Sequence, residues 1–438
     1  MMKHVLALGT FTVVGASVTG AGALALLGSD TMEVLTNLVL NDTAADCGGT
    51  NNTPAGTLTY AGTGSTNGEN AMIAATQQIS PMSRPLKASV CASNPNYRMN
   101  PVALDAISIL VARREGTAGV VDSAYTAPVI TDPTQKTCLG VKFSTGAPFN
   151  RIRAVFSGGD GTTATATGSA ANCTSTFRTS ILNNWTNFTS STCGHAGNPI
   201  RHAFRRDDKS GTTDTFKSLV GVSGFCNGAA TGLAGGNQDL DPVRRTCHAN
   251  EQVCSPNGDL GVVLAISVPA TSPYPGAGAP PDTQADRQAR YANTEFHRLH
   301  QSLTLAVGAT ACRRADSTEQ IGCLVAVSPY STGFAGLEAT KVSGATYLKV
   351  GNVTPSVKTI RAFGTSTAYP ITRRLFVNDL VGNAAVTGDE AKALGCYTNR
   401  TFMETPAGTS KVEAAGFVTM TALPSDPLPA AITDQTCF

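Results

Sequence analysis

The stretch "LALLGSDTMEVLTNLVL" (24–40) reads as a buried strand, a tight turn and a helix. The strand ends at Gly28, and Ser29, Asp30 or Thr31 can then cap the helix that follows. Free N–H groups at such a helix start, together with the helix dipole, favour a bound anion. Because caps of this kind are common, ordinary helix capping is the alternative interpretation of the same residues.

Strand and helix patterns alternate through the rest of the chain. The apolar runs "ALDAISILVAR" (103–113) and "LGVVLAISV" (260–268) are typical of buried strands. Helical composition marks residues 283–307 and "GDEAKAL" (388–394). The mixture predicts an α/β fold. The Gly/Thr/Ala-rich stretch at 158–176 predicts an inserted surface loop.

Length and charge narrow the classes of protein and partner. A chain of 438 residues is long enough for two or three domains with real cores. The formal net charge is +2 and no polybasic run exists, so neither a nucleic acid nor an acidic membrane surface is expected as a partner. Beyond the N-terminus, we expect no membrane span, because no stretch is long and apolar enough.

The N-terminus has the order of features of a signal peptide. Lys3 precedes an apolar run, and Ala21-Gly22-Ala23 is a small-residue cleavage site, so we expect residues 1–23 to be removed on export. A first core strand or helix is the alternative. No cysteine lies at the cleavage region, so the prediction is an exported periplasmic or extracellular protein without a lipid anchor.

The cysteines agree with an oxidising compartment. There are twelve, an even number, and they are spread along the chain, which is typical of disulfides. "CHANEQVC" (247–254) could hold zinc, but it lacks a second close pair of ligands. The sequence does not determine the pairing, and three local guesses are Cys173–Cys193, Cys312–Cys323 and Cys396–Cys437.

A second stretch that can hold an anion is "YAGTGSTNGENAMIAATQQIS" (60–80). Its glycines let backbone N–H groups approach an anion, and the Ser65 hydroxyl can donate a hydrogen bond. A dinucleotide-binding turn is the rival interpretation, but the glycine spacing only approximates that motif and an exported chain meets little NAD. No cofactor is therefore expected.

The third stretch is "RRDDKSGTTDTF" (205–216), which concentrates charge in a chain with few charged residues. Ser210, Gly211 and Thr212 can start a helix, and Arg206 can make a bidentate contact with an oxyanion. Asp208 lies close enough in sequence to orient that arginine. A solvated charged turn is the alternative, and it weakens when three such helix starts occur in one chain.

A further turn, "SPMSRPLK" (80–87), adds Ser83 and Arg84. Ser83 could donate a hydrogen bond to an anion. Arg84 could bind the anion or face water, and the sequence does not separate these two roles.

Taken together, these motifs resemble phosphate-binding proteins of ABC-type phosphate uptake systems. "GSDTM", "YAGTGSTNGENAM", "SRPL", "ALDAISILV", "FSGG", "RRDDKSGTTDTF", "IGCLVAV" and "YPITRRLFV" occur in the family's order, from about residue 24 to at least 377. The resemblance implies a two-lobed type 2 periplasmic-binding-protein fold, with a ligand cleft between α/β lobes joined by two crossing strands. It divides the chain into 24–110 with 326–438 as lobe 1, and 111–325 as lobe 2.

The resemblance also implies roles for individual residues. Thr31 matches the donor of the first loop and Ser65 the serine of the glycine-rich loop. Arg206 matches the arginine that meets the anion, with Asp208 as its orienting partner, and Ser210, Gly211 and Thr212 match the helix-start donors. The implied ligand is phosphate or a similar oxyanion, and the implied partner is an ABC permease served by a monomer.

The chain departs from the family pattern in three places. The best-known members have an aspartate at the position of Arg84, and that carboxylate accepts the proton of hydrogen phosphate, which sulfate lacks. Asp30 could act as the proton acceptor instead. Cys323 stands where an aromatic residue is expected after "IG", and the chain is longer and richer in cysteine than typical members.

No catalytic constellation stands out, so we expect a binding protein. His297 and His300 are three residues apart and could share a metal, but no third ligand is evident nearby. The site hydroxyls lack an adjacent base for nucleophilic catalysis. The alternatives are a surface interaction protein on a binding-protein scaffold with lost or altered ligand specificity, and a secreted phosphatase-like enzyme.

Overall fold

We describe the fold from a computed structural model of the chain. The residues it describes are 24–42, 57–112, 149–159, 166–188, 200, 203–206, 210–226, 263–266, 318, 321–322, 325, 332–341, 345–380, 386–406, 408–421 and 435–436. The predicted signal peptide, Asp208, His297, His300, the 247–254 stretch and the helix predicted at 283–307 lie outside these residues. Within them, no helix is long and apolar enough to cross a membrane.

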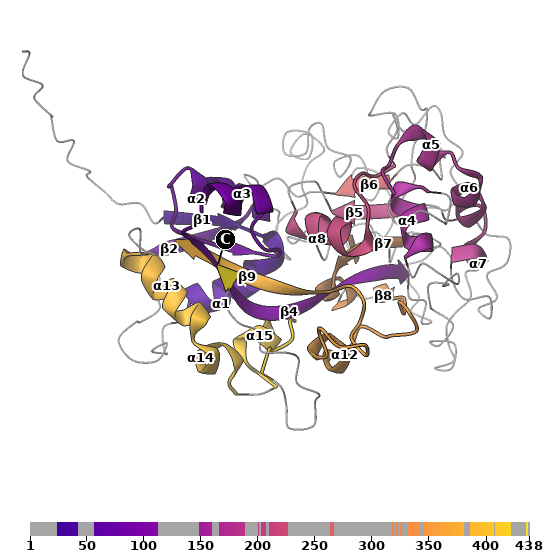
Figure 1. The fold of residues 1–438 in the computed structure, drawn as a ribbon. Helices are drawn as coiled ribbons and strands as arrows, with labels where there is room; N and C mark the ends of the chain where they lie inside the picture. The colour runs from indigo at the N-terminus through magenta and orange to yellow at the C-terminus, as the bar shows by residue number, and fades with distance from the viewer. Residues whose placement is uncertain are drawn as a thin grey trace, which may run out of the picture.

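A mixed sheet runs through the whole molecule (Figure 1). Its strand order is β3-β9-β4-β7-β5-β6, with β8 and β10 also pairing with β4. The strands are β3 (Ile79–Met82), β4 (Tyr97–Ala112), β5 (Ala203–Arg206), β6 (Val263–Ile266), β7 (Thr332–Gly336), β8 (Ala345–Tyr347), β9 (Thr372–Leu380) and β10 (Gln435–Thr436). The apolar runs predicted as strands at 103–113 and 260–268 are confirmed where the structure describes them, because β4 contains residues 103–112 and β6 lies within 260–268.

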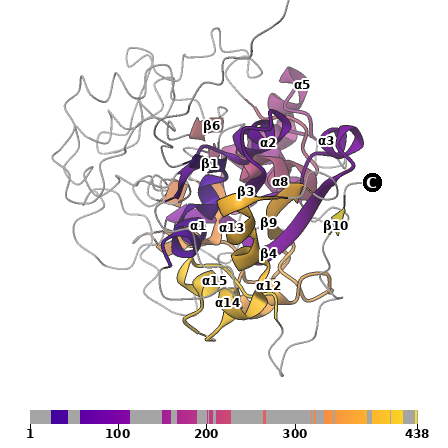
Figure 2. The ribbon, with the colours of Figure 1, turned by 90° about the vertical axis from the view of Figure 1, so that its left-hand side faces the viewer.

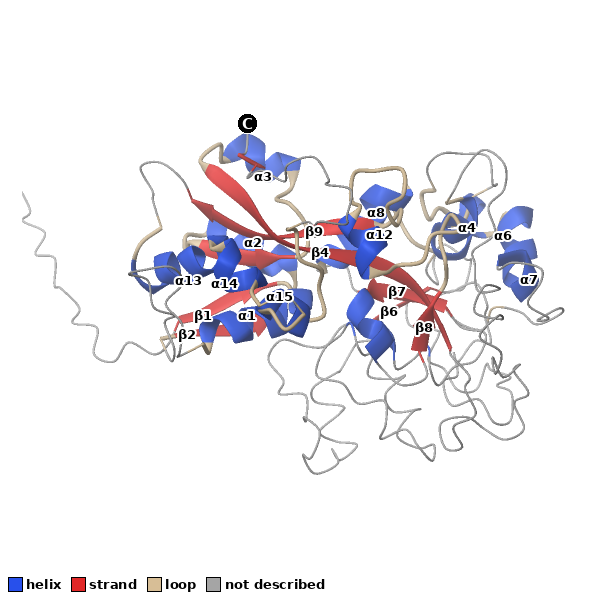
Figure 3. Ribbon diagram, turned by 90° about the horizontal axis from the view of Figure 1, so that it is seen from below, coloured by secondary structure: helices blue, strands red, loops and turns tan. Residues whose placement is uncertain are grey.

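Two long antiparallel strands, β4 and β9, join two lobes (Figure 3). Their register runs from Tyr97 opposite Leu380 to Ala106 opposite Thr372, and β4 then continues beside β7 from Ile107. Val102, near the start of β4, lies in one hydrophobic core, and Ile109, further along the strand, lies in another. The expected α/β architecture with two lobes and two crossing strands is therefore present.

The first lobe contains both ends of the described chain. It holds the parallel pair β1 (Leu24–Gly28) and β2 (Leu58–Gly62), strand β3, and the helices η1 (Asp30–Met32), α1 (Glu33–Leu40), α2 (Ser65–Ile73), α3 (Ala88–Ser93), α13 (Gly388–Thr398), α14 (Arg400–Glu404) and α15 (Lys411–Ala414). Its core combines N-terminal side chains such as Leu26 and Leu35 with C-terminal ones such as Val377 and Phe417. The strand, turn and helix predicted for 24–40 are confirmed.

The second lobe packs helices on β5, β6, β7 and β8. These are α4 (Asn150–Ser157), α5 (Ala170–Cys173), α6 (Thr176–Leu182), α7 (Trp185–Phe188), α8 (Gly211–Val220), η7 (Leu337–Lys341) and α12 (Val357–Arg361). Phe216 of α8 stacks on Phe334 of β7 with ring centroids 3.8 Å apart, and Phe156 meets both rings edge-on. This aromatic contact anchors α8, whose first turn faces the other lobe.

One disulfide corrects a sequence-based guess. Cys173 pairs with Cys226, 53 residues away, and not with Cys193. The guesses that involve Cys312 and Cys437 reach outside the described residues. The predicted loop at 158–176 is also partly wrong, because Ala170–Cys173 form helix α5 and Ala166 bridges to Val222.

The residue ranges assigned to the two lobes stay a prediction. The packing of the hydrophobic cores indicates where the chain returns from the second lobe to the first. Phe334, Leu348, Ile360 and Ile371 all belong to the core of the second lobe. That membership favours a return to the first lobe along β9, later than the predicted boundary near residue 325.

Candidate oxyanion-binding site

The turn after β1 supplies three buried polar residues to the space between the lobes. Ser29 and Thr31 are fully buried and Asp30 nearly so. The Ser29 hydroxyl donates to the Ser83 hydroxyl at 2.8 Å and makes no capping hydrogen bond to the helix behind it. Ordinary capping, the alternative interpretation of this turn, is therefore not what the Ser29 side chain does.

The partly buried side chain of Tyr60 supports that turn. The Tyr60 hydroxyl donates to the carbonyl oxygen of Ser29 at 2.6 Å. Burial raises the pKa of Tyr60 well above its usual value, so its hydroxyl stays protonated and remains a donor. The carbonyl side of the Ser29 turn is thereby held by Tyr60.

The glycine-rich stretch places Ser65 at the start of α2, next to the Ser83 turn. Gly64 has φ of 104°, a left-handed conformation that favours glycine, and α2 begins at the next residue. The Ser65 hydroxyl oxygen accepts a hydrogen bond from the backbone N–H of Ser83 at 3.1 Å. Ser29, Ser65 and Ser83 thus form one buried cluster of hydroxyls in the first lobe.

The second lobe brings the start of α8 onto this cluster. Ser210 caps the helix, and its hydroxyl oxygen accepts from the backbone N–H of Thr212 at 3.2 Å. A Cβ added at Gly211 would lie 2.3 Å from the Ser65 Oγ and 2.6 Å from the Ser83 Oγ. Only glycine permits this approach, which brings α8 and α2 together (Figure 2).

A contact between Thr31 and Thr212 closes the ring of residues. Their hydroxyl oxygens are 3.2 Å apart, although 181 positions separate them in the sequence. The residues predicted at 31, 65, 83 and 210–212 are therefore brought together in space.

Arg206 ends β5 and crosses to the first lobe. Its side chain is 1% exposed, it pairs with the Asp30 carboxylate, and its Nη1 donates to Thr318 Oγ1 at 2.9 Å. Asp30 thus orients Arg206, while Asp208, the residue predicted for this role, lies outside the described residues. The second carboxylate oxygen of Asp30, Oδ1, is buried and has no hydrogen-bond donor among the described residues.

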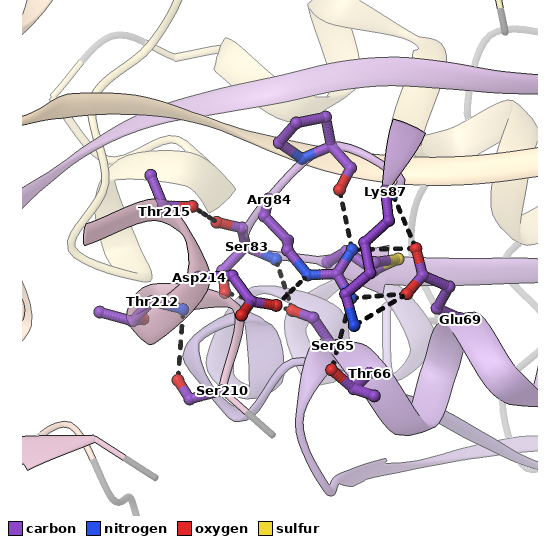
Figure 4. Close-up of polar contacts among 12 residues, drawn as sticks. Ser65, Thr66, Glu69, Ser83, Arg84, Lys87, Ser210, Thr212, Asp214 and Thr215 are labelled. Atoms are coloured by element: carbon purple, nitrogen blue, oxygen red, sulfur yellow. Dashed lines mark hydrogen bonds and ion pairs between the residues drawn. The ribbon is translucent and has the colours of Figure 1, made fainter. Parts of the chain in front are cut away.

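Arg84 is held by two carboxylates (Figure 4). Its Nη1 and Nη2 donate to the two oxygens of Glu69 at 3.0 and 2.7 Å. Its Nε lies 2.8 Å from Asp214 of α8, in the other lobe. Because these acids already compensate its charge, the arrangement favours a role in joining the lobes over the predicted contact with an anion.

Arg373 is a site residue that the sequence analysis missed. From β9 it forms a buried ion pair with Asp105 of β4, at 2.6 and 3.0 Å, and the two residues are directly opposite each other in the ladder. Its Nη1 also donates to Ser83 O at 3.2 Å and to Thr212 Oγ1 at 2.8 Å. One arginine on the crossing strands thus contacts both lobes.

The whole cluster contains the kinds of groups that could bind a small polar anion. Hydroxyls, helix-start N–H groups and a guanidinium are strong donors for oxygen ligands, and Asp30 Oδ1 is an acceptor. Within the described residues, no group of three or more His, Cys, Asp or Glu could hold a metal ion.

Comparisons with known proteins find similar folds at low identity. No family model and no curated protein matches the chain. One of these folds belongs to a Clostridium perfringens protein assigned as a phosphate ABC transporter substrate-binding protein, whose crystal structure contains bound phosphate. It aligns over 91% of this chain and 100% of its own chain, with 11% identity and a TM-score of 0.44. An ABC-type phosphate transport receptor from Vibrio cholerae aligns over 90% and 99%, with 11% identity and a TM-score of 0.39.

A phosphate-binding protein from Stenotrophomonas maltophilia aligns over 91% of both chains, with 14% identity and a TM-score of 0.39. All three TM-scores lie below 0.5. Likeness at this level does not transfer a ligand or a role from one protein to another.

Proposed function

We propose that the protein binds a protonated oxyanion, with monohydrogen phosphate as the leading candidate, between its two lobes. One observation carries the proposal: hydroxyls and helix starts from both lobes converge on one buried point, beside Arg206 and the unsatisfied acceptor of Asp30. Buried polar groups are normally satisfied, so an acceptor without a partner calls for a ligand that carries a proton.

Asp30 supplies the selectivity in this proposal. An ionised carboxylate only accepts hydrogen bonds, so Oδ1 attracts the hydroxyl of a protonated oxyanion and repels the bare oxygens of sulfate. Asp30 would therefore take the part played in the resembling family by an aspartate at the position of Arg84. Arg206, Ser65 and the start of α8 would hold the remaining anion oxygens.

In its biological setting, we propose that the protein is an exported solute-binding protein. The N-terminal signal and the dispersed cysteines support export, and the resemblance supports delivery of phosphate to an ABC permease. A ligand held between two lobes favours lobe closure, which a permease could recognise.

Isothermal titration calorimetry of the oxidised protein with phosphate tests the binding proposal. We expect saturable one-to-one binding and a loss of affinity of about thirtyfold or more for Arg206→Ala, since truncating one partner of a buried charge pair costs about 2–5 kcal/mol. Arg400→Ala, an arginine paired with Glu404 at 3.5 Å outside the cleft, is the matched control and should bind normally.

Ser65→Ala provides a second test that leaves the charges in place, with circular dichroism confirming that each variant is folded. If phosphate, sulfate and arsenate all fail to bind the folded wild-type protein, the proposal is wrong. Release of phosphate from a chromogenic ester, abolished by Arg206→Ala, would instead indicate the phosphatase-like alternative.

A further inference from the structure

A cavity of about 390 Å³ lies between the lobes beside Arg84. The turn after β3 contributes residues 84–87, α8 contributes 214–215 and 218–219, and β9 contributes 372–374 and 376. Phe363, which follows α12, completes the lining. Cavities of this size at junctions between domains are common sites for small molecules.

Apolar side chains form much of the cavity wall. Leu86 and Phe376 are almost fully buried, and Leu219 and Phe363 are partly buried. This lining differs from the hydroxyl-rich oxyanion site and would accept a flat apolar group. A small inorganic anion could not fill such a cavity or use its apolar walls.

The charged residues of the cavity are mostly positive. Arg84, Lys87, Arg373 and Arg374 line it, against a single carboxylate, Asp214. Three of these cations have an acidic partner, because Arg84 meets Glu69 and Asp214, Arg373 meets Asp105, and the Nζ of Lys87 lies near Glu69. The uncompensated charge therefore belongs mainly to Arg374.

Among the four cations that line the cavity, Arg374 is the one without an ion pair to a described residue. Its Nε is buried without a hydrogen-bond partner among the described residues. Its guanidinium carbon lies 5.1 Å from the centroid of the Phe363 ring. Lys87 is close to half exposed, and its Nζ is 3.7 Å from Glu69. A buried guanidinium N–H without a hydrogen-bond partner is a point at which an anionic group could bind.

We propose that this cavity binds a small amphipathic organic anion, with a flat apolar body against Leu86 and Phe376 and a carboxylate or sulfonate on Arg374. Both lobes and the crossing strand β9 line the cavity, so a ligand there favours the closed arrangement of the lobes. The site is separate from the proposed oxyanion site, although Arg373 contributes to both.

The probe for this proposal is 8-anilinonaphthalene-1-sulfonate, an aromatic sulfonate that fluoresces when bound in apolar surroundings. We expect saturable one-to-one binding to the folded, oxidised protein by fluorescence and calorimetry. Arg374→Met keeps the apolar stem and should weaken binding at least tenfold, while Arg374→Lys should retain part of it. Lys358→Met, which removes a cation from α12 outside the cavity, should leave binding unchanged.

Competition with phosphate tests whether this site is distinct from the oxyanion site. We expect the probe to bind in the presence of saturating phosphate and to bind Arg206→Ala as well as wild type, so this test does not depend on the proposed function. Loss of the probe on addition of phosphate would overturn the claim of a separate site. Equal binding by wild type and Arg374→Met, or several weak sites per chain, would overturn the assignment to this cavity.

Discussion

Replacing Asp30 by asparagine isolates the acceptor in the proposed oxyanion site. In the wild-type protein, Asp30 Oδ2 pairs with Arg206 and Oδ1 is buried without a donor. Asparagine has nearly the same shape, but its amide nitrogen donates where a carboxylate oxygen accepts. The substitution therefore converts a group that requires a proton on the ligand into one that can bind a bare oxygen.

The expected magnitude follows from one hydrogen bond between a charged acceptor and the ligand. Such bonds contribute about 1.5–3 kcal/mol net, which corresponds to about ten- to a hundredfold in affinity. Asp30→Asn also breaks the ion pair with Arg206, but that loss affects phosphate and sulfate alike. The ratio of the two affinities cancels it, so we expect the preference for phosphate over sulfate to fall by at least about tenfold.

Calorimetric titrations with both anions, at one mildly alkaline pH and one ionic strength, measure this ratio. Asp379→Asn is the matched control, because Asp379 is a buried first-lobe carboxylate that pairs with Arg98 at 2.8 Å, outside the site. It should reduce stability and leave the ratio unchanged. An unchanged ratio in Asp30→Asn, with both anions still bound, would refute the assignment of Asp30 as the acceptor.

Three further variants test other parts of the structure. Gly211→Ala should leave helix content intact but block the approach of the lobes, at a cost of about 1–3 kcal/mol, and so weaken phosphate binding about five- to a hundredfold in the same titration. Asp105→Ala leaves the Arg373 charge buried and alone, so urea unfolding should show a loss of about 3–5 kcal/mol, and a loss below 1 kcal/mol would contradict the pairing. Replacing Cys173 and Cys226 together by alanine removes the cross-link that closes a loop of 53 residues. The free energy of unfolding under non-reducing conditions should fall by up to about 4 kcal/mol. Unchanged stability would contradict a stabilising role for this disulfide.

Local signals in the sequence were enough to predict the turns of the site. Gly28, Gly64 and Ser210 mark transitions into helices, because caps and left-handed glycines are properties of a few adjacent residues. The same kind of signal predicted β4 from its apolar run. Resemblance to a known family then indicated that these separate turns belong to one cleft.

Partners of the buried charges could not be predicted in the same way. Arg206 pairs with Asp30, 176 positions away, whereas the sequence suggested its near neighbour Asp208, which lies outside the described residues. Asp105 did carry a signal, since a carboxylate inside an apolar strand requires a partner. Nothing local identifies Arg373 as that partner, because their pairing depends on the register between β4 and β9.

The path of the crossing strands has a consequence for how the chain matures during synthesis. The core of the first lobe needs Leu375 and Val377 from β9 and Phe417 beyond it, in addition to the N-terminal Leu26 and Leu35. A ribosome releases the N-terminal part of this lobe early and the completing part hundreds of residues later. The lobe that starts first is therefore finished last, because its hydrophobic core is incomplete until β9 and Phe417 have been synthesised.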